Sequence, residues 1–206
     1  MRYFCVIICV LLAFAAPAAA IDHTLAKQIL AEINLARTEP LAYAGFVREF
    51  RRQFRGKYYL QPGSVVRVRT SEGVKAVDEA IRFLSRSKPL PPMVWSDGLA
   101  AAAAELAVDQ GDSGATGHTG SQNRGVRERI EQHGKWERRI GENIGYGPKA
   151  PRDMVMQLII DDGVPDRGHR TNTFSRDFTT AGVACGPHPR FRNMCVIDFA
   201  GGFRDR

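Results

Sequence analysis

The sequence lacks the short motifs by which many enzymes are recognised. It contains no HExxH, no GxSxG, no phosphate-binding loop and no dinucleotide-binding glycine fingerprint. The acidic residues Asp161, Asp162 and Asp166 do not have the alternating ligand spacing of a calcium-binding loop. These absences argue against the zinc proteases, serine hydrolases, nucleotide-binding enzymes and calcium-binding proteins that carry those motifs.

Cysteine is scarce as well. The chain has 4 cysteines, and Cys5 and Cys9 lie in an N-terminal segment that we expect to be removed. Cys185 and Cys195 remain, and their spacing is not the CxxC of a zinc ribbon. In an exported protein, an even number of cysteines indicates a disulfide. We therefore expect Cys185 and Cys195 to be bonded, and the short loop that they close would contribute about 3 kcal/mol to stability.

Only one long apolar run occurs, and it lies at the N-terminus. Arg2 precedes it, residues 6–16 form it, and alanines at 18–20 follow it, which is the order of regions in a secretory signal. The run is too short for a confident membrane span, which needs about 20 residues. The pattern predicts a cleaved signal peptide over residues 1–20, with an uncleaved anchor as the alternative. Residues 21–206 would then form one soluble domain, secreted to the periplasm or the extracellular space.

Acidic residues are outnumbered by basic ones. The chain has 29 lysines and arginines against 22 aspartates and glutamates, for a formal net charge of +7. A basic excess often indicates nucleic-acid binding, but an exported protein meets little nucleic acid. We therefore expect no nucleic-acid partner, and anionic lipids, lipopolysaccharide or acidic glycans become the candidate anions.

Apolar residues recur at helical spacing over much of the chain. Helices are predicted over 24–37 with Thr24 as the cap, over 46–57, from 74 to about 84, after a cap at Ser96 or Asp97, and within 121–134 and 151–162. The segments 179–186 and 194–203 have the composition of strands, and 139–147 fits a short strand or turn. Helices with late, adjacent strands predict an α+β fold in which helices pack on an antiparallel sheet.

The segment 46–57 is unusually basic. Its phenylalanines recur every four residues, at Phe46, Phe50 and Phe54. Arginines fill the other faces of the expected helix, at Arg48, Arg51, Arg52 and Arg55. Two interpretations remain open: a helix that buries phenylalanine and exposes arginine to solvent, or a helix that lies on an anionic membrane or glycan.

Histidines and acids adjoin glycines at several sites. His118 lies in GHTGS, Glu142 in IGENIG and His169 in DRGHR, while Asp161 and Asp162 end a predicted helix. An acid is disfavoured at a helix C-terminus by the helix dipole, which suggests a specific role for these aspartates. Imidazoles and carboxylates are ligands of zinc and similar divalent cations, and they equally line polar clefts.

These motifs, in their order and spacing, resemble the CAP superfamily of cysteine-rich secretory, antigen 5 and pathogenesis-related class 1 proteins. The resemblance rests on NLAR, GHTGS, GENIGYG, RGHRTN and FTTAGVAC, and covers about residues 24–203. It implies a secreted three-layer α-β-α sandwich with a central antiparallel sheet. It also implies a cleft formed by His118, His169, Glu142 and a second acid, which is Asp161 or Asp162.

The chain departs from the family pattern in two places. GHRTNTF lacks the tryptophan that follows the second histidine in many eukaryotic members, and resembles the bacterial form. A basic insertion of roughly 30 residues lies within about 45–90, where we expect a role specific to this chain.

Three functions are consistent with the sequence. In the first, His118 and His169 hold a divalent cation, zinc foremost, or the cleft holds another small ligand, and the acids orient the rings. In the second, the cleft is a hydrolase site with Glu142 or Ser121 as weak catalytic candidates, although no complete catalytic motif supports an enzyme. In the third, the domain, expected to be a monomer, binds lipid or glycan through the arginines of the insertion.

Overall fold

A four-stranded sheet lies at the centre of the computed structural model, which describes residues 21–61 and 63–206. The strand order is β4 (Val94–Trp95), β7 (Thr180–His188), β8 (Arg192–Ala200) and β6 (Ile140–Tyr146). The three long strands pair antiparallel, and the short β4 pairs parallel with β7. The predicted antiparallel sheet is therefore confirmed for its long strands, and β6 is an edge strand.

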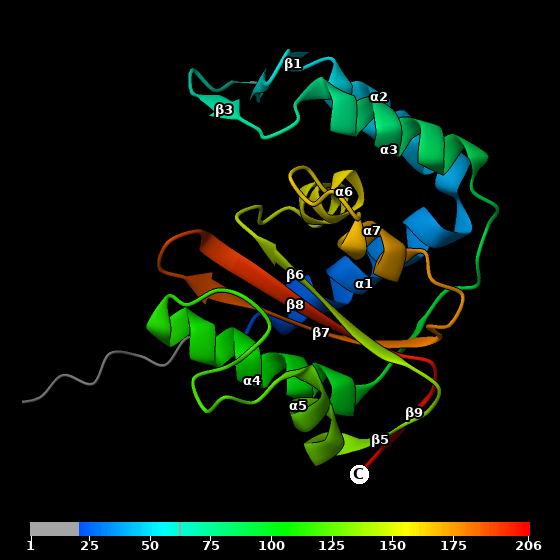
Figure 1. The fold of residues 1–206 in the computed structure, drawn as a ribbon, viewed down its shortest axis with the longest axis vertical. Helices are drawn as coiled ribbons and strands as arrows, with labels where there is room; N and C mark the ends of the chain where they lie inside the picture. Colours follow the sequence, from blue (N-terminus) through cyan, green and yellow to red (C-terminus); the bar gives the residue numbers. More distant parts are fainter. Residues whose placement is uncertain (1–20, 62) are drawn as a thin grey trace, which may run out of the picture.

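Helices cover both faces of this sheet (Figure 1). One face carries α1 (His23–Thr38), α6 (Pro151–Ile160) and α7 (Gly168–Thr173), while the other carries α4 (Asp97–Ser113) and α5 (Val126–His133). Tight packing requires glycine at one contact, because a Cβ on Gly182 would lie 2.0 Å from the backbone nitrogen of Ala100. The arrangement confirms the predicted α+β fold and the three-layer α-β-α sandwich.

The apolar residues of the first helix pack into the core as their spacing predicts. Leu25, Ile29 and Ile33 are buried in the main core, as their spacing predicts. The N-cap is Asp22, whose Oδ1 accepts a hydrogen bond from the backbone nitrogen of Leu25 at 2.9 Å. The prediction of Thr24 as the cap is wrong, because Asp22 supplies the acceptor one turn before the first buried leucine.

The basic insertion forms a helical hairpin with a small sheet at one end. Its elements are α2 (Pro40–Arg51), β1 (Phe54–Arg55), β2 (Tyr58–Leu60), β3 (Arg67–Arg69) and α3 (Val74–Arg86). The insertion lies outside the layer of α1 and α6, and its small sheet projects from the end of the helical pair (Figure 1).

The predicted helix over 46–57 is correct only for its first half. It ends at Arg51, and Phe54 lies in β1, where its ring stacks on Tyr59. Phe50 contacts both rings edge-on, with centroids 5.2 Å from Phe54 and 5.1 Å from Tyr59. Phenylalanine at every fourth position is compatible with a helix, but burial of Phe54 against the strand partner overrides that local preference.

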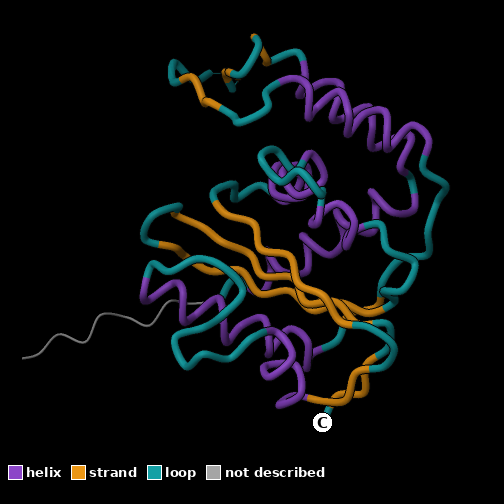
Figure 2. Tube along the Cα trace, in the orientation of Figure 1, coloured by secondary structure: helices purple, strands orange, loops and turns teal. Residues whose placement is uncertain are grey.

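The predicted disulfide is present. Cys185 and Cys195 are direct neighbours in the β7–β8 register, with Cα atoms 4.1 Å apart. A further two-stranded sheet, β5 (Gly134–Trp136) with β9 (Phe203–Asp205), lies beside α5 at the C-terminal end (Figure 2). Within residues 21–61 and 63–206, no helix is both long and apolar enough to cross a membrane. The predicted signal peptide over 1–20 lies outside the described residues.

Candidate functional site

The edge strand β6 brings the two helical layers together at one site. Successive side chains of a strand point to opposite faces of the sheet. Glu142 therefore faces the layer of α4 and α5, where it contacts His118 and Arg129. Asn143 faces the other layer and donates from Nδ2 to the carbonyl oxygen of His169 at 2.9 Å.

The first histidine is held by a buried carboxylate. Nδ1 of His118 lies 2.8 Å from Oε1 of Glu142, whose side chain is buried. This hydrogen bond raises the pKa of His118, because the carboxylate stabilises the protonated ring. Arg129 donates to the other oxygen of Glu142 and, at 3.1 Å, to the carbonyl oxygen of His118. Arg129 thus fixes both members of the pair.

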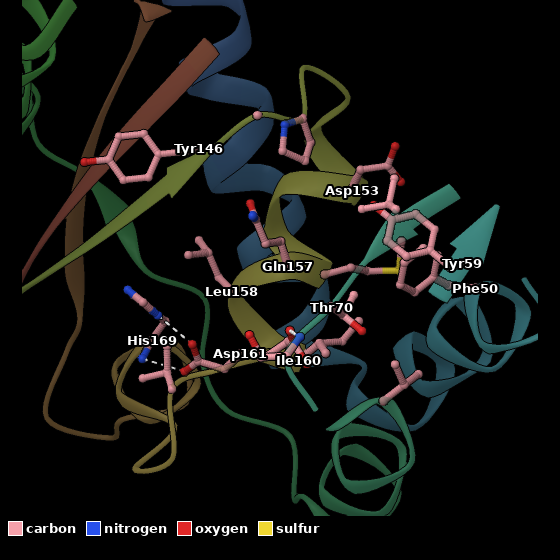
Figure 3. A pocket seen from close by; sticks show the side chains of 18 of the residues that line it. Phe50, Tyr59, Thr70, Tyr146, Asp153, Gln157, Leu158, Ile160, Asp161 and His169 are labelled. Atoms are coloured by element: carbon pink, nitrogen blue, oxygen red, sulfur yellow. Dashed lines mark hydrogen bonds and ion pairs between the residues drawn. The ribbon is translucent and has the colours of Figure 1, made fainter. Parts of the chain in front are cut away.

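The second histidine has an equivalent partner. Nδ1 of His169 lies 2.6 Å from Oδ1 of Asp161, a contact marked in Figure 3. The second oxygen of Asp161 accepts from the backbone nitrogens of His169 at 2.9 Å and Arg170 at 3.2 Å. Asp161 follows α6 in a left-handed conformation with φ of 58°, which turns its side chain to the start of α7. The helix dipole disfavours a negative charge at the C-terminal end of α6. The two backbone N–H donors compensate for this unfavourable interaction of Asp161.

The neighbouring Asp162 binds the insertion. Its carboxylate accepts from the backbone nitrogens of Ser71 at 2.6 Å, Glu72 at 2.8 Å and Gly73 at 3.2 Å. These three residues lead directly into α3, whose N-cap is Gly73. Of the two candidate acids, Asp161 therefore contacts His169, and Asp162 attaches α3 to the cleft loop.

Two arginines beside His169 strengthen this attachment. Arg167 pairs with Glu72 at 2.6 Å and with Glu79 at 2.8 Å, and Arg170 also pairs with Glu79 at 2.8 Å. The hydrogen bonds from Arg167 lower the pKa of both glutamates to about 2. The insertion is thus tied by ion pairs to the segment that carries the second histidine.

Both histidines open onto one cavity of about 870 Å³. His118, His169, Asp161 and Tyr146 line it, and Figure 3 shows Gln157, Leu158 and Ile160 of α6 between His169 and the rings of Phe50 and Tyr59. The insertion and α6 also contribute Phe50, Phe54, Tyr59, Val68, Val77 and Met156, together with the polar side chains of Arg69, Thr70 and Asp153. The insertion therefore adds aromatic, aliphatic and polar side chains to the wall of the cleft.

Sequence reasoning missed two buried charged residues behind His118. Arg129 contacts Glu142 as described, and Asp198 lies opposite Glu142 in the β6–β8 register. The side chain of Asp198 is completely buried, and no donor among the described residues reaches its carboxylate oxygens. Burial and the charge of Glu142 raise the pKa of Asp198 well above its usual value. The available signal was an aspartate within the apolar strand sequence MCVIDFA.

Ser121 does not lie at this cavity. Its backbone nitrogen donates to Oδ2 of Asp109 at 2.9 Å, and its hydroxyl donates to Oδ1 of the same carboxylate. Ser121 and Asp109 line a separate hollow along α4. Among residues 21–61 and 63–206, no hydrogen bond joins Ser121 to a histidine.

The four arginines of the segment 46–57 make contacts within the insertion. Arg51 pairs with Asp78 of α3, and Arg52 pairs with Glu49 at 2.8 Å. Arg48 donates to the hydroxyl of Ser85 at 2.8 Å, and Arg55 donates to the carbonyl oxygen of Phe54 at 2.9 Å. The positive charges of Arg51 and Arg52 are therefore balanced locally.

Over the described part of the chain, no group of three or more histidine, cysteine, aspartate or glutamate side chains is arranged to hold a metal ion. The carboxylates of Glu142 and Asp161 are engaged with ring nitrogens and backbone or arginine donors. The donors left for a cation are the Nε2 atoms of the two histidines.

Comparison with known families identifies the domain. The model of the cysteine-rich secretory protein family, CAP, matches residues 30–199. The chain belongs to the CAP family. This CAP protein thus has the fold that its motifs predict. No curated protein matches it.

Two solved structures are similar to this CAP protein. An extracellular protein containing an SCP domain from Bacillus anthracis strain Ames has 18% identity and a TM-score of 0.44, over 62% of this chain and 37% of that one. An outer surface protein of Borrelia burgdorferi has 17% identity and a TM-score of 0.46, over 57% of this chain and 80% of that one. The chain thus spans little more than a third of the Bacillus protein.

Proposed function

We propose that this CAP protein is exported and that its cleft binds a divalent cation, zinc foremost, through His118 and His169. The Cys185–Cys195 disulfide supports export, because disulfides persist in oxidising compartments. The N-terminal pattern of a signal peptide supports it as well.

The observation that carries the cation proposal is the matched orientation of the two rings. Each histidine directs Nδ1 at a buried carboxylate, at 2.8 Å for Glu142 and 2.6 Å for Asp161. An ionised carboxylate only accepts hydrogen bonds, so Nδ1 carries the hydrogen in both rings. The lone pair of the neutral imidazole then lies on Nε2. Metal-binding histidines are commonly fixed in this way by a carboxylate on the other nitrogen.

The residues fit a cation that is held incompletely by protein. Two imidazoles are fewer than the three protein ligands of most catalytic zinc sites, so the remaining positions would be filled by water or by a small ligand. The adjoining cavity of about 870 Å³ has room for such a ligand. A bound divalent cation would polarise a carbonyl or phosphoryl oxygen of that ligand. Glu142 and Asp161 would hold the rings still, and Arg129 would hold Glu142.

Calorimetric titration with zinc tests the proposal. We expect one site in the wild-type protein and loss of binding in the double variant His118→Ala/His169→Ala. His133→Ala is a matched control, because Nε2 of His133 contacts Glu105 at 2.6 Å outside the cleft. Equal zinc binding by the double variant and the wild type would show that the cleft is not the site.

A hydrolase has no comparable support. The hydroxyl of Ser121 is engaged with Asp109 in a hollow separate from the histidines. Glu142 is engaged with Arg129 and His118, so both of its oxygens already accept hydrogen bonds. Binding is therefore the function that the geometry favours.

A further inference from the structure

The small sheet of the insertion exposes apolar side chains that the fold leaves uncovered. Val65 and Val66, between β2 and β3, are 94% and 67% exposed, and Tyr58 and Leu60 of β2 are 45% and 41% exposed. Single exposed apolar residues are common on protein surfaces, but a group on one projecting hairpin indicates an interaction site.

The hairpin is held in place rather than free. Its inner face carries Tyr59 and Val68, which are direct neighbours in the β2–β3 register. Tyr59 stacks on Phe54 with centroids 5.1 Å apart, and both Tyr59 and Val68 line the cavity. At its base, Thr70 donates through its backbone nitrogen to the carbonyl oxygen of Lys57 at 2.8 Å. Contact of Tyr59 with Phe54 therefore turns the opposite face of the hairpin to solvent.

On the outer face of the hairpin, apolar side chains lie beside arginines. Residues that are opposite each other in an antiparallel sheet lie on the same face. Tyr58 is opposite Arg55 on one side and Arg69 on the other, and Leu60 is opposite Arg67. We name these five residues, which are all exposed, the basic hairpin face, and Val65 and Val66 the hairpin tip.

Positive charge on this face is uncompensated. No acidic residue occurs in the sequence between Glu49 and Glu72. Among residues 21–61 and 63–206, no ion pair involves Arg55, Arg67 or Arg69. Arg51 and Arg52 differ in this respect, because each has a carboxylate partner.

We propose that the basic hairpin face and hairpin tip dock this protein on an anionic lipid bilayer. The arginines would lie among anionic headgroups, and Tyr58 would lie at the interface, where its ring is apolar and its hydroxyl is polar. Val65 and Val66 would enter the acyl boundary, as the apolar residues of interfacial segments do. An acidic glycan or nucleic acid would neutralise the arginines but leave the two valines in water, so a bilayer accounts for both features. Of the four arginines predicted from the sequence, docking would thus involve Arg55, together with Arg67 and Arg69, rather than Arg48, Arg51 and Arg52.

Flotation with lipid vesicles tests the docking. Protein purified after expression of the full chain is mixed with neutral phosphatidylcholine vesicles, or with vesicles that also contain phosphatidylglycerol. We expect binding to the anionic vesicles, weakened by salt. Arg55→Gln/Arg67→Gln/Arg69→Gln should weaken it on the order of 100-fold, since each cation near the surface contributes about 1 kcal/mol. The matched control is Arg86→Gln/Lys88→Gln/Arg190→Gln, which removes three exposed cations elsewhere and should bind as the wild type does.

A second pair of variants tests entry of the tip. Val66→Trp should show blue-shifted emission and quenching by brominated lipid, whereas Val94→Trp, at a site that is 69% exposed on the body, should show neither. Val65→Ser/Val66→Ser should bind anionic vesicles at least about 10-fold more weakly than the wild type.

Five results would overturn the proposal, the first four of which follow. They are binding that does not depend on anionic lipid, binding unchanged in the triple arginine variant, equal quenching of the two tryptophan variants, and a dimer in solution that Val65→Ser/Val66→Ser dissociates. Retained vesicle binding in Val65→Ser/Val66→Ser would also contradict it, because the surface would then be a general polyanion site.

Discussion

Replacement of Arg129 by methionine should destabilise the domain severely while leaving it folded. The side chains of Arg129 and Glu142 are each only 2% exposed. Loss of the guanidinium would leave the Glu142 carboxylate buried next to Asp198, with His118 as its remaining partner. It would also remove the donors to the carbonyl oxygens of His118 and Arg124. Removing one partner of a buried ion pair costs about 3–5 kcal/mol, against a total stability of about 5–15 kcal/mol for a typical domain.

Urea denaturation followed by tryptophan fluorescence measures this cost, and a double-mutant cycle assigns it to charge. Arg129→Met/Glu142→Gln should be more stable than Arg129→Met alone, because a neutral glutamine needs no counter-ion. A coupling energy above about 1 kcal/mol is expected. Arg127→Met is the control on the same helix, since the exposed pair of Arg127 with Glu131 should contribute less than about 1 kcal/mol. A loss below about 1 kcal/mol in Arg129→Met, or no recovery in the double variant, would refute the reasoning.

Two further predictions concern pH. The pKa of Asp198 is raised in the folded state, so its contribution to stability is complete below about pH 3.8 and is lost as pH rises through the folded pKa. Asp198→Asn should therefore gain stability relative to the wild type as pH increases above 4, by at most about 1.4 kcal/mol per pH unit in urea titrations, and a constant difference would contradict this. The pKa values of Glu72 and Glu79 are lowered from 4.5 to about 2, so their contribution is present above about pH 4.5 and is lost as pH falls toward 2. Glu72→Gln/Glu79→Gln should flatten the fall in unfolding free energy over that window, by a modest amount because both side chains are partly exposed; an unchanged slope would show that the pairs with Arg167 add no stability.

The sequence predicted those structural features that depend on residues close together in the chain. The buried stripe of α1, the strands β7 and β8 and the Cys185–Cys195 bond follow from periodicity, strand composition and cysteine count. The identity of the cleft residues came from motif order, because GHTGS, GENIG and RGHR are each too short to be specific alone. Taken together, the three motifs predicted that His118 and His169 lie at one cleft.

Local sequence patterns could not show which of two adjacent aspartates contacts His169, or that Phe54 packs against a residue of a strand. Asp161 and Asp162 are neighbours with the same side chain, and only the left-handed turn after α6 sends one to His169 and the other to α3. The phenylalanine spacing continued past Arg51, but contact with Tyr59 placed Phe54 in a strand.

For this protein, the sequence by itself predicted the α+β class, the CAP family pattern, and His118, His169 and Glu142 as cleft residues, because each depends on residues close together in the chain or on their order. Only the tertiary structure decided that Asp161 contacts His169, that Arg129 and Asp198 lie behind Glu142, that the insertion is attached to the His169 loop, and that Arg55, Arg67 and Arg69 share one face of a hairpin. Those outcomes depend on contacts between residues that are not neighbours in sequence, and burial determines which charges need a partner there.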